Sequence, residues 1–178
     1  IDPENGDLGF SFPFGARGPT VNAASPLVQD DLLFVTASYG VGDKLVKMRT
    51  DEVLAVWEND DTLSSQYNTP VIHKGHLYGI HGREDIGVAE LRCVDLKTGT
   101  IKWTRDNFYT ANLILADDKL IAINNEGQSY LIAADAKAYK ELGSFRPFQD
   151  VPRALPALSS GYLVARDTGN NGGSLKCF

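Results

Sequence analysis

The chain has 178 residues, of which 43% are hydrophobic and 10% aromatic. This content is enough for a packed core and is higher than that of a disordered chain. Seventeen basic residues stand against 23 acidic ones, a net charge of −6, and the Lys and Arg residues are scattered along the chain. This balance argues against nucleic acid and anionic membrane surfaces as partners. The sequence also lacks an apolar run close to the roughly 20 residues that span a bilayer.

The first 15 residues, IDPENGDLGFSFPFG, begin with turn-forming residues and end in a short aromatic segment. Phe10, Phe12 and Phe14 alternate, so a strand over residues 8–14 would place them on one face. We expect this strand to be the outermost strand of a blade whose inner strands lie elsewhere in the chain.

The rest of the chain repeats at a regular interval. Aligning Asp31, Gly75, Asp118 and Gly161 gives spacings of 44, 43 and 43 residues between successive units. A period of this length, filled by short alternating strands, is typical of a β-propeller blade. The sequence therefore predicts an all-β propeller built of four-stranded antiparallel blades, about four of them in this chain.

Each unit is expected to hold an inner strand, a tight polar turn, a second strand, a variable loop, a third strand and an outer strand ending in an aromatic residue. The expected inner strands are Pro26–Val28, Pro70–His73, Leu113–Ala116 and Pro156–Ser159, and the second strands are Leu32–Ala37, His76–Ile80, Lys119–Ile123 and Tyr162–Arg166. The third strands are Lys44–Met48, Glu90–Asp95, Ser129–Ala134 and Leu175–Phe178, and the outer strands are Val53–Glu58, Ile101–Arg105 and Lys140–Phe145.

The four blades are expected at about residues 25–58, 69–106, 112–146 and 155–178, and the last one lacks an outer strand. Residues 8–14 could supply that strand and close a four-bladed ring. Alternatively, missing sequence completes the last blade, and the chain is part of a seven- or eight-bladed ring, which is the solution we favour. Unpaired strand edges seek partners, so we expect a dimer or completion by further blades.

One blade carries a recognisable signature, "LRCVDLKTGTIKW", from Leu91 to Trp103. It resembles the repeats of pyrroloquinoline-quinone-type (PQQ-like) β-propellers in Asp95, Thr98, Gly99 and Trp103. The resemblance implies that the Trp packs between neighbouring blades, while the Asp and the Thr-Gly pair fix the turn before the outer strand. Trp57 is the corresponding aromatic of the preceding blade.

Two kinds of protein share such repeats. Quinoprotein dehydrogenases hold PQQ and calcium and typically carry adjacent cysteines, whereas binding and scaffold propellers hold neither. The cysteines of this chain, Cys93 and Cys177, are not adjacent. They occupy the same third-strand position two repeats apart, so we expect both to remain free thiols.

We therefore expect a non-catalytic, exported, bacterial propeller, periplasmic or otherwise secreted, that acts as a binding or scaffold module for a protein or carbohydrate partner. Its signal peptide would lie upstream of Ile1. No cofactor and no catalytic residue is predicted, because the sequence carries no nucleophile or phosphate-binding motif. The alternative is a segment of a PQQ- and calcium-dependent alcohol or sugar dehydrogenase.

The three histidines, His73, His76 and His81, are interpreted as surface or edge residues. A zinc site would need all three within about 2.1 Å of one ion, yet His81 lies a strand's length from the other two.

The variable loops are the better place for a binding site, because a propeller gathers the loops between second and third strands, together with the blade-to-blade loops, on one face. Polar residues in these loops could orient a polar ligand or calcium, or could simply suit turns. The candidate ligand-binding residues are Asn22, Asn68, Arg83, Asp85, Asn124, Glu126, Arg153 and Asp167, with Asn170 and Asn171 in the last loop.

Overall fold

The computed structural model describes residues 2–18, 20–169 and 172–178, which form fifteen strands and no helix. The first sheet contains β1 (Leu27–Gln29), β2 (Leu32–Ala37), β3 (Gly42–Met48) and β4 (Val53–Asn59), paired in that order and antiparallel throughout. Because neighbouring strands in the sheet are also neighbours in sequence, each connection is a hairpin. This up-and-down sheet is a propeller blade.

The same plan repeats in the three following sheets. Blade 2 contains β5 (Val71–His73), β6 (His76–Arg83), β7 (Val88–Asp95) and β8 (Ile101–Arg105). Blade 3 contains β9 (Ala111–Ala116), β10 (Lys119–Asn124), β11 (Ser129–Ala133) and β12 (Glu141–Phe145). Blade 4 contains only β13 (Ala157–Ser159), β14 (Tyr162–Arg166) and β15 (Leu175–Cys177).

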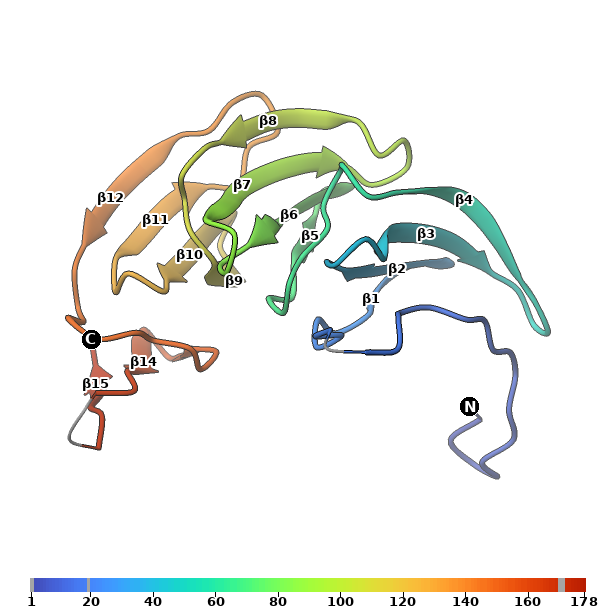
Figure 1. Ribbon diagram of the computed structural model, residues 1–178, viewed down its shortest axis with the longest axis horizontal. Coiled ribbons are helices and arrows are strands. Elements are labelled where there is room, and N and C mark those ends of the chain that lie inside the picture. Colours follow the sequence, from blue (N-terminus) through green and yellow to red (C-terminus); the bar gives the residue numbers. More distant parts are fainter. Residues whose placement is uncertain (1, 19, 170–171) are drawn as a thin grey trace.

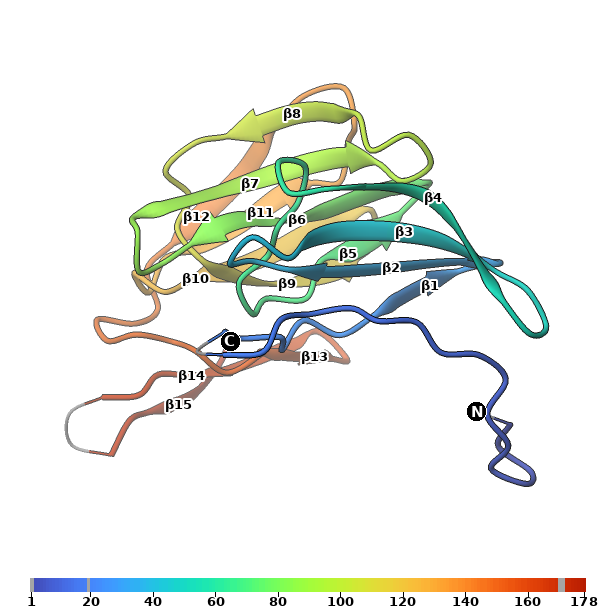
Figure 2. The ribbon, with the colours of Figure 1, turned by 45° about the vertical axis from the view of Figure 1, so that its right-hand side comes forward.

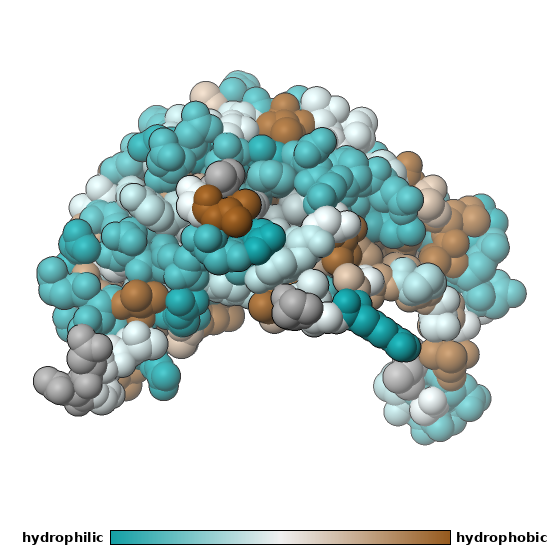
Figure 3. Space-filling model, viewed as in Figure 1, coloured by the Kyte–Doolittle hydropathy of each residue, from teal (hydrophilic) through white to brown (hydrophobic). Residues whose placement is uncertain are grey.

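The blades follow one another around an arch, with β1, β5 and β9 on its inner side and β4, β8 and β12 on its outer side (Figures 1 and 2). Consecutive inner strands contact each other, β1 with β5 and β5 with β9. The outer surface is mostly hydrophilic with scattered hydrophobic residues, and the molecule is hollowed beneath the arch (Figure 3). The architecture is the predicted β-propeller.

All fifteen strands expected in the four repeats are present, with ends that differ by a few residues. The strand expected over residues 8–14 is wrong, because this segment forms no strand and does not pair with β15. It runs beside blade 1, where Gly9 approaches the carbonyl oxygen of Thr50 and Phe14 lies near Glu58. The two ends of the chain lie at opposite ends of the arch (Figure 1), so the chain does not close into a four-bladed ring. Alternating aromatic residues form a strand only where another strand offers hydrogen bonds, and none reaches this segment.

The turn that joins each inner strand to the second strand explains the regular spacing. It is a two-residue turn with a left-handed backbone, at Asp30 (φ 54°), Lys74 (φ 48°), Asp117 (φ 46°) and Ser160 (φ 50°). Asn, Asp and Gly tolerate this conformation best, and such turns match the twist of the strands that they connect. The anchors Asp31, Gly75, Asp118 and Gly161 are thus equivalent positions in the structure.

The signature of blade 2 works as the resemblance implies. One oxygen of the Asp95 carboxylate accepts the backbone N–H of Thr98 and its hydroxyl, both at 3.0 Å. Gly99 adopts φ +70°, and a Cβ there would lie 3.2 Å from the ring of Trp57. Glycine suits this position for two reasons: the turn needs a left-handed backbone, and the neighbouring indole leaves little room for a side chain.

Both tryptophans bridge adjacent blades. The Trp57 indole N–H donates to the carbonyl of Leu96 at 2.9 Å, and that of Trp103 donates to the carbonyl of Asp135 at 2.8 Å. Each ring is half-buried and tilts against an aromatic of its own blade, Phe34 or Tyr78. Apolar clusters complete these junctions, with Leu45, Leu63 and Leu77 between blades 1 and 2, and Leu91, Leu113 and Leu120 between blades 2 and 3. These contacts fix blades 1, 2 and 3 relative to one another.

Candidate functional site

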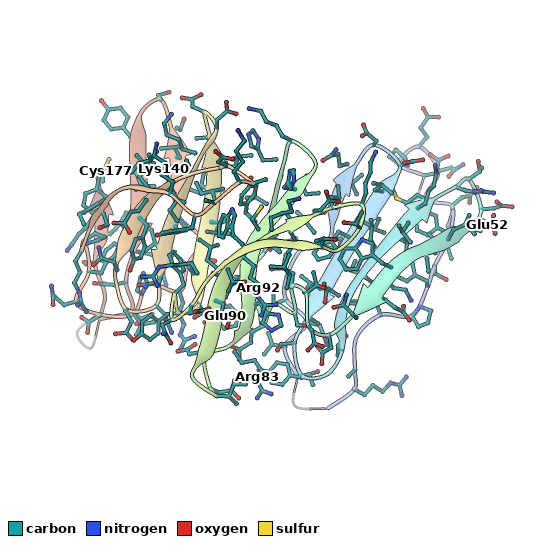
Figure 4. The ribbon with its side chains drawn as sticks, turned by 90° about the horizontal axis from the view of Figure 1, so that it is seen from above. Glu52, Arg83, Glu90, Arg92, Lys140 and Cys177 are labelled. Carbon is teal, nitrogen blue, oxygen red and sulfur yellow. The ribbon has the colours of Figure 1, made fainter. Side chains whose placement is uncertain are left out.

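The loops that join second to third strands lie at one end of the strands, together with the blade-to-blade loops. We call this end the loop face. Figure 4 labels Arg83, at the end of β6 on the loop face, and Lys140, before β12 at the opposite edge. The hairpin turns of the inner strands share the edge of Lys140. The loop face therefore gathers the variable loops of successive blades, whereas the opposite edge carries only short turns, where Lys74 and His73 meet Asp118.

The centre of the loop face is a cluster of Tyr67, Glu84 and Arg153, which we call the axial cluster. Arg153 donates two parallel hydrogen bonds to the Glu84 carboxylate, both at 2.9 Å, and a third to the Tyr67 hydroxyl at 3.2 Å. The Tyr67 hydroxyl also donates to Glu84 at 2.8 Å. A bidentate arginine–carboxylate pair is geometrically specific and strong for its class.

Three different loops supply this cluster. Tyr67 comes from the loop between blades 1 and 2, Glu84 from the β6–β7 loop, and Arg153 from the loop between blades 3 and 4. Burial alone would raise the pKa of Glu84, but the hydrogen bonds from Arg153 and Tyr67 outweigh it and lower that pKa. The Arg153 side chain is still 51% exposed, so the cluster is open to a partner.

A second group of side chains adjoins the axial cluster. The Arg83 guanidinium pairs with Asp85 and lies over the ring of Tyr39, 4.0 Å from its centroid. Gln66 connects Tyr39 and Asp85, because its side-chain amide donates to the Tyr39 hydroxyl at 2.8 Å and to the Asp85 carboxylate at 3.3 Å. The Gln66 carbonyl oxygen accepts the backbone N–H of Glu84 at 2.9 Å, which links this group to the axial cluster.

A chain of amides crosses the blade-to-blade loops. Asn68, only 3% exposed, donates to the side chain of Asn112 at 3.0 Å, and Asn112 donates to the carbonyl of Arg153 at 3.0 Å. These bonds, between residues 44 and 41 positions apart in sequence, link the blade 1–2 loop to β9 and β9 to the blade 3–4 loop. They hold the backbone from which Arg153 reaches Glu84.

Four of the candidate residues therefore belong to one connected network: Asn68, Arg83, Asp85 and Arg153. The side chains of the other candidates that the structure describes form no hydrogen bond with it, although Glu126 borders the same cavity as Arg83 and Glu84. Asn22 contacts the turn at Ala16 and Thr20, and Asn124 is fully buried and binds the backbone of Phe108, Glu126 and Gln128. Glu126 borders a cavity between blades 2 and 3, and Asp167 is buried against Ser174 in its own loop. Asn170 and Asn171 lie outside the described residues.

The sequence did not single out Tyr67 or Thr110, whose hydroxyls lie 3.0 Å apart at the cluster. The clue available was position: Tyr67 adjoins Asn68 in a loop already expected on this face. A tyrosine in a loop can pack through its ring and form hydrogen bonds through its hydroxyl.

Among the described Asp and Glu residues, Asp43 has the pKa that is raised most above its ordinary value. It is 2% exposed, one carboxylate oxygen accepts the backbone N–H of Leu63 at 3.1 Å, and the other has no partner. Burial, with a smaller contribution from Asp60, raises its pKa to about 7. It joins blade 1 to the loop that leads into blade 2.

The histidines do not meet at a metal site. The His73 ring lies 2.9 Å from Asp118, and the Nδ1 atom of His81 accepts the backbone N–H of Ser64 at 3.2 Å. Among the described residues, no three His, Cys, Asp or Glu side chains are placed to hold one ion. Cys93 is buried and Cys177 exposed, and both are free thiols at the same register, opposite Tyr78 and Val164.

The residues do not fit a PQQ site. A quinone needs a stacking floor and a polarising cation beside it. Both tryptophans lie in the outer strands β4 and β8 and are bonded to the next blade. The two cysteines lie in different blades, two repeats apart. Glu84, the acid of the axial cluster, is already held by Arg153 and Tyr67.

Comparison with solved structures places the fold among the β-propellers. The crystal structure of BamB from Moraxella catarrhalis aligns with a TM-score of 0.64 and 13% identity over 86% of this chain and 42% of the BamB chain. The computationally designed Ika4 protein aligns with a TM-score of 0.68 and 13% identity, covering 97% of this chain and 98% of the designed one. A europium-containing methanol dehydrogenase aligns with a TM-score of 0.57 and 12% identity over 75% of this chain and 26% of the enzyme.

These similarities confirm the resemblance to PQQ-like propellers at the level of the fold. The chain spans about two fifths of BamB and about a quarter of the dehydrogenase. No model of a known protein family and no curated protein matches the sequence. The described residues also contain no helix that is long and apolar enough to cross a membrane. The chain is a propeller module.

Proposed function

We propose that this chain is a non-catalytic, exported binding module that presents the axial cluster to a partner protein. The observation that carries the proposal is the partly exposed Tyr67–Glu84–Arg153 cluster, built from three separate loops on a rigid frame. Tyr39 and Arg83 extend it with a further aromatic–guanidinium pair. Tyrosine and arginine are the residue types that dominate the energetic centres of protein interfaces.

An exported, periplasmic location suits this role. The structural neighbours BamB and methanol dehydrogenase have the same fold, but at 12–13% identity they support the proposal only through that fold. An oxidoreductase role finds less support, because the described residues do not fit a quinone site.

The test uses two charge-swapped variants of the full chain. In Glu84→Arg/Arg153→Glu the pair can re-form, so the fold is kept while the pattern presented to a partner is reversed. The matched control is Asp31→Lys/Lys47→Asp, an exposed ion pair of 2.9 Å at the opposite edge. A partner from an envelope extract is identified by cross-linking and mass spectrometry, purified, and its affinity measured by interferometry.

We expect the axial swap to weaken binding by about tenfold or more, and the control to leave it unchanged. Equal binding by the wild type and both variants would refute the axial cluster as the interface. A dye-reduction assay with added PQQ and calcium over simple alcohols and aldoses should show no turnover. Turnover would instead support the dehydrogenase.

The arch itself is proposed to belong to a larger ring, closed by further blades or by a second copy. All three residues of β15 are exposed, and Leu155, Tyr162 and Leu175 present apolar surface at that end of the arch. Sheet edges and apolar faces of this kind associate. The chain alone should dimerise or aggregate in light scattering, whereas a monodisperse monomer would contradict this proposal.

A further inference from the structure

A second recess lies on the loop face between blades 1 and 2, outside the axial cluster. Its volume is about 480 Å³, within the range of small-ligand sites. Its walls come from the β2–β3 loop, the blade 1–2 loop and the end of β6, and they include Tyr39, Asp60, Ser64, His81 and Ile86. We call it the blade 1–2 pocket.

His81 gives this pocket a neutral hydrogen-bond donor. A backbone N–H can only donate, so the bond from Ser64 N–H to Nδ1 leaves the ring proton on Nε2. Burial, followed by the nearby Arg92, lowers the pKa of His81, so the ring is neutral at physiological pH. The imidazole therefore contributes one fixed N–H and no charge.

Asp60 gives the pocket an oriented acceptor. Its Oδ1 atom accepts the Ser64 hydroxyl at 2.7 Å, and the same hydroxyl lies 2.6 Å from the Asp60 carbonyl oxygen. Ser64 therefore contacts both side chains: its hydroxyl donates to the Asp60 carboxylate, and its backbone N–H donates to the His81 ring. A donor and an acceptor are held at fixed positions in one wall.

Tyr39 and Ile86 add aromatic and apolar surface to walls that also include Thr20, Ser38 and Arg83. Ile86 is 59% exposed at the rim, so its apolar side chain is accessible to a ligand. The Arg83 guanidinium covers one face of the Tyr39 ring, so a ligand can contact the other face or the edge. Tyr39 is also held at φ +66°, a left-handed conformation that costs a tyrosine energy and recurs at binding sites.

We propose that the blade 1–2 pocket binds a neutral polyhydroxylated ring, that is, a monosaccharide unit. Sugar hydroxyls both donate and accept, so they can satisfy Asp60 and the His81 N–H together. The C–H face of a pyranose suits Tyr39 and Ile86. An anion would face the Asp60 carboxylate, and the Arg83 charge is taken up by Asp85. This proposal does not rest on Tyr67, Glu84 or Arg153, although Tyr39 and Arg83 border both sites.

The experiment is saturation-transfer NMR on the full chain with the methyl α-pyranosides of glucose, galactose and mannose as probes. Saturation transfer to at least one probe is expected, with a shift of the His81 ring resonances on its addition. No transfer to any of the three from folded protein would overturn the proposal. Displacement of a bound probe by sodium acetate or methylammonium chloride would overturn its neutral-ligand part.

Two variants locate the site. Asp60→Asn keeps an oxygen for the Ser64 hydroxyl but removes the carboxylate, and Ile86→Ser removes the apolar rim from an exposed position. Each should weaken binding by about fivefold to tenfold. The control is Asp31→Asn, in the exposed ion pair at the opposite edge, which should bind as the wild type does. Binding unaffected by both pocket variants, or lost equally in the control, would refute this pocket as the site.

Discussion

The junctions of blade 2 with its two neighbours differ from the junction between blades 3 and 4. The first two each have a tryptophan that donates across the junction, to Leu96 or to Asp135. At the last junction the corresponding residue is Phe145, which is 46% exposed and meets Phe178 at a centroid distance of 5.4 Å without a hydrogen bond. Blade fixation therefore weakens toward blade 4.

The difference has a consequence for the loop face. Glu84 and Tyr67 are carried by the strongly fixed blades, whereas Arg153 reaches them from the loop leading into blade 4. A hydrogen bond from the side-chain amide of Asn112 to the carbonyl of Arg153 holds that loop at the weakest blade junction. Preorganisation of the axial cluster thus depends on loop hydrogen bonds as well as on blade packing.

The largest expected effect is at a tryptophan junction. Trp103→Ala removes the bond to Asp135 and the contacts with Tyr78 and Tyr139, and it should lower the free energy of unfolding by about 3–5 kcal/mol. Phe145→Ala should cost only about 1 kcal/mol, because the ring is half exposed. Urea unfolding followed by circular dichroism measures both, and equal losses would contradict the comparison of the junctions.

Asp43 makes the junction between blades 1 and 2 sensitive to pH. Its folded-state pKa of about 7 lies above the ordinary value of 3.8, so the folded state binds the proton more tightly than the unfolded chain. The contribution of Asp43 to stability therefore falls as pH rises from about 4 to 7, and the full penalty remains above 7.

Asp43→Asn removes that titration while keeping an oxygen for the Leu63 N–H. Relative to the wild type, the variant should gain stability at pH 8, on the order of 2 kcal/mol, and change little at pH 4. Urea unfolding at the two pH values measures this. A difference between variant and wild type that is the same at both pH values would show that Asp43 is not the titrating group.

The sequence was sufficient for the repeat and its strands, because the two-residue turns at Lys74 and Asp117 recur with the hydrophobic pattern on both sides of them. It misplaced the segment with Phe10 and Phe12, since pairing depends on which strand edge is near and no local pattern records that. Within the candidate site, loop position predicted Arg83, Asp85 and Arg153, but not which side chains would pair with one another. Glu84 and Arg153 are 69 residues apart, and only the curvature of the arch brings them together.

A smaller effect is expected at the signature turn of blade 2. Thr98→Ala removes the hydroxyl bonds to Asp95 and Thr100 but keeps the backbone N–H bond to Asp95, so it should cost about 1 kcal/mol. Thr98→Ser is the matched control, because it retains the hydroxyl. Thermal unfolding should rank the wild type and Thr98→Ser above Thr98→Ala. A loss as large as that of Trp103→Ala would mean that the turn, and not the indole, fixes the junction.

The smallest perturbation is chemical labelling of the two cysteines, which compares blade 2 with blade 4 without mutation. Cys93 is fully buried beside Tyr78, and burial raises its pKa to about 11, whereas Cys177 is exposed in β15. Only the thiolate reacts, so Cys177 should be modified by a disulfide reagent within the dead time at pH 8, and Cys93 only after unfolding. Thiol counting should find about one reactive thiol in the native protein and about two in the denatured, unreduced protein. Two fast thiols in the native protein would mean that blade 2 opens as readily as blade 4, and one or none after denaturation would contradict the equivalent register of the two strands.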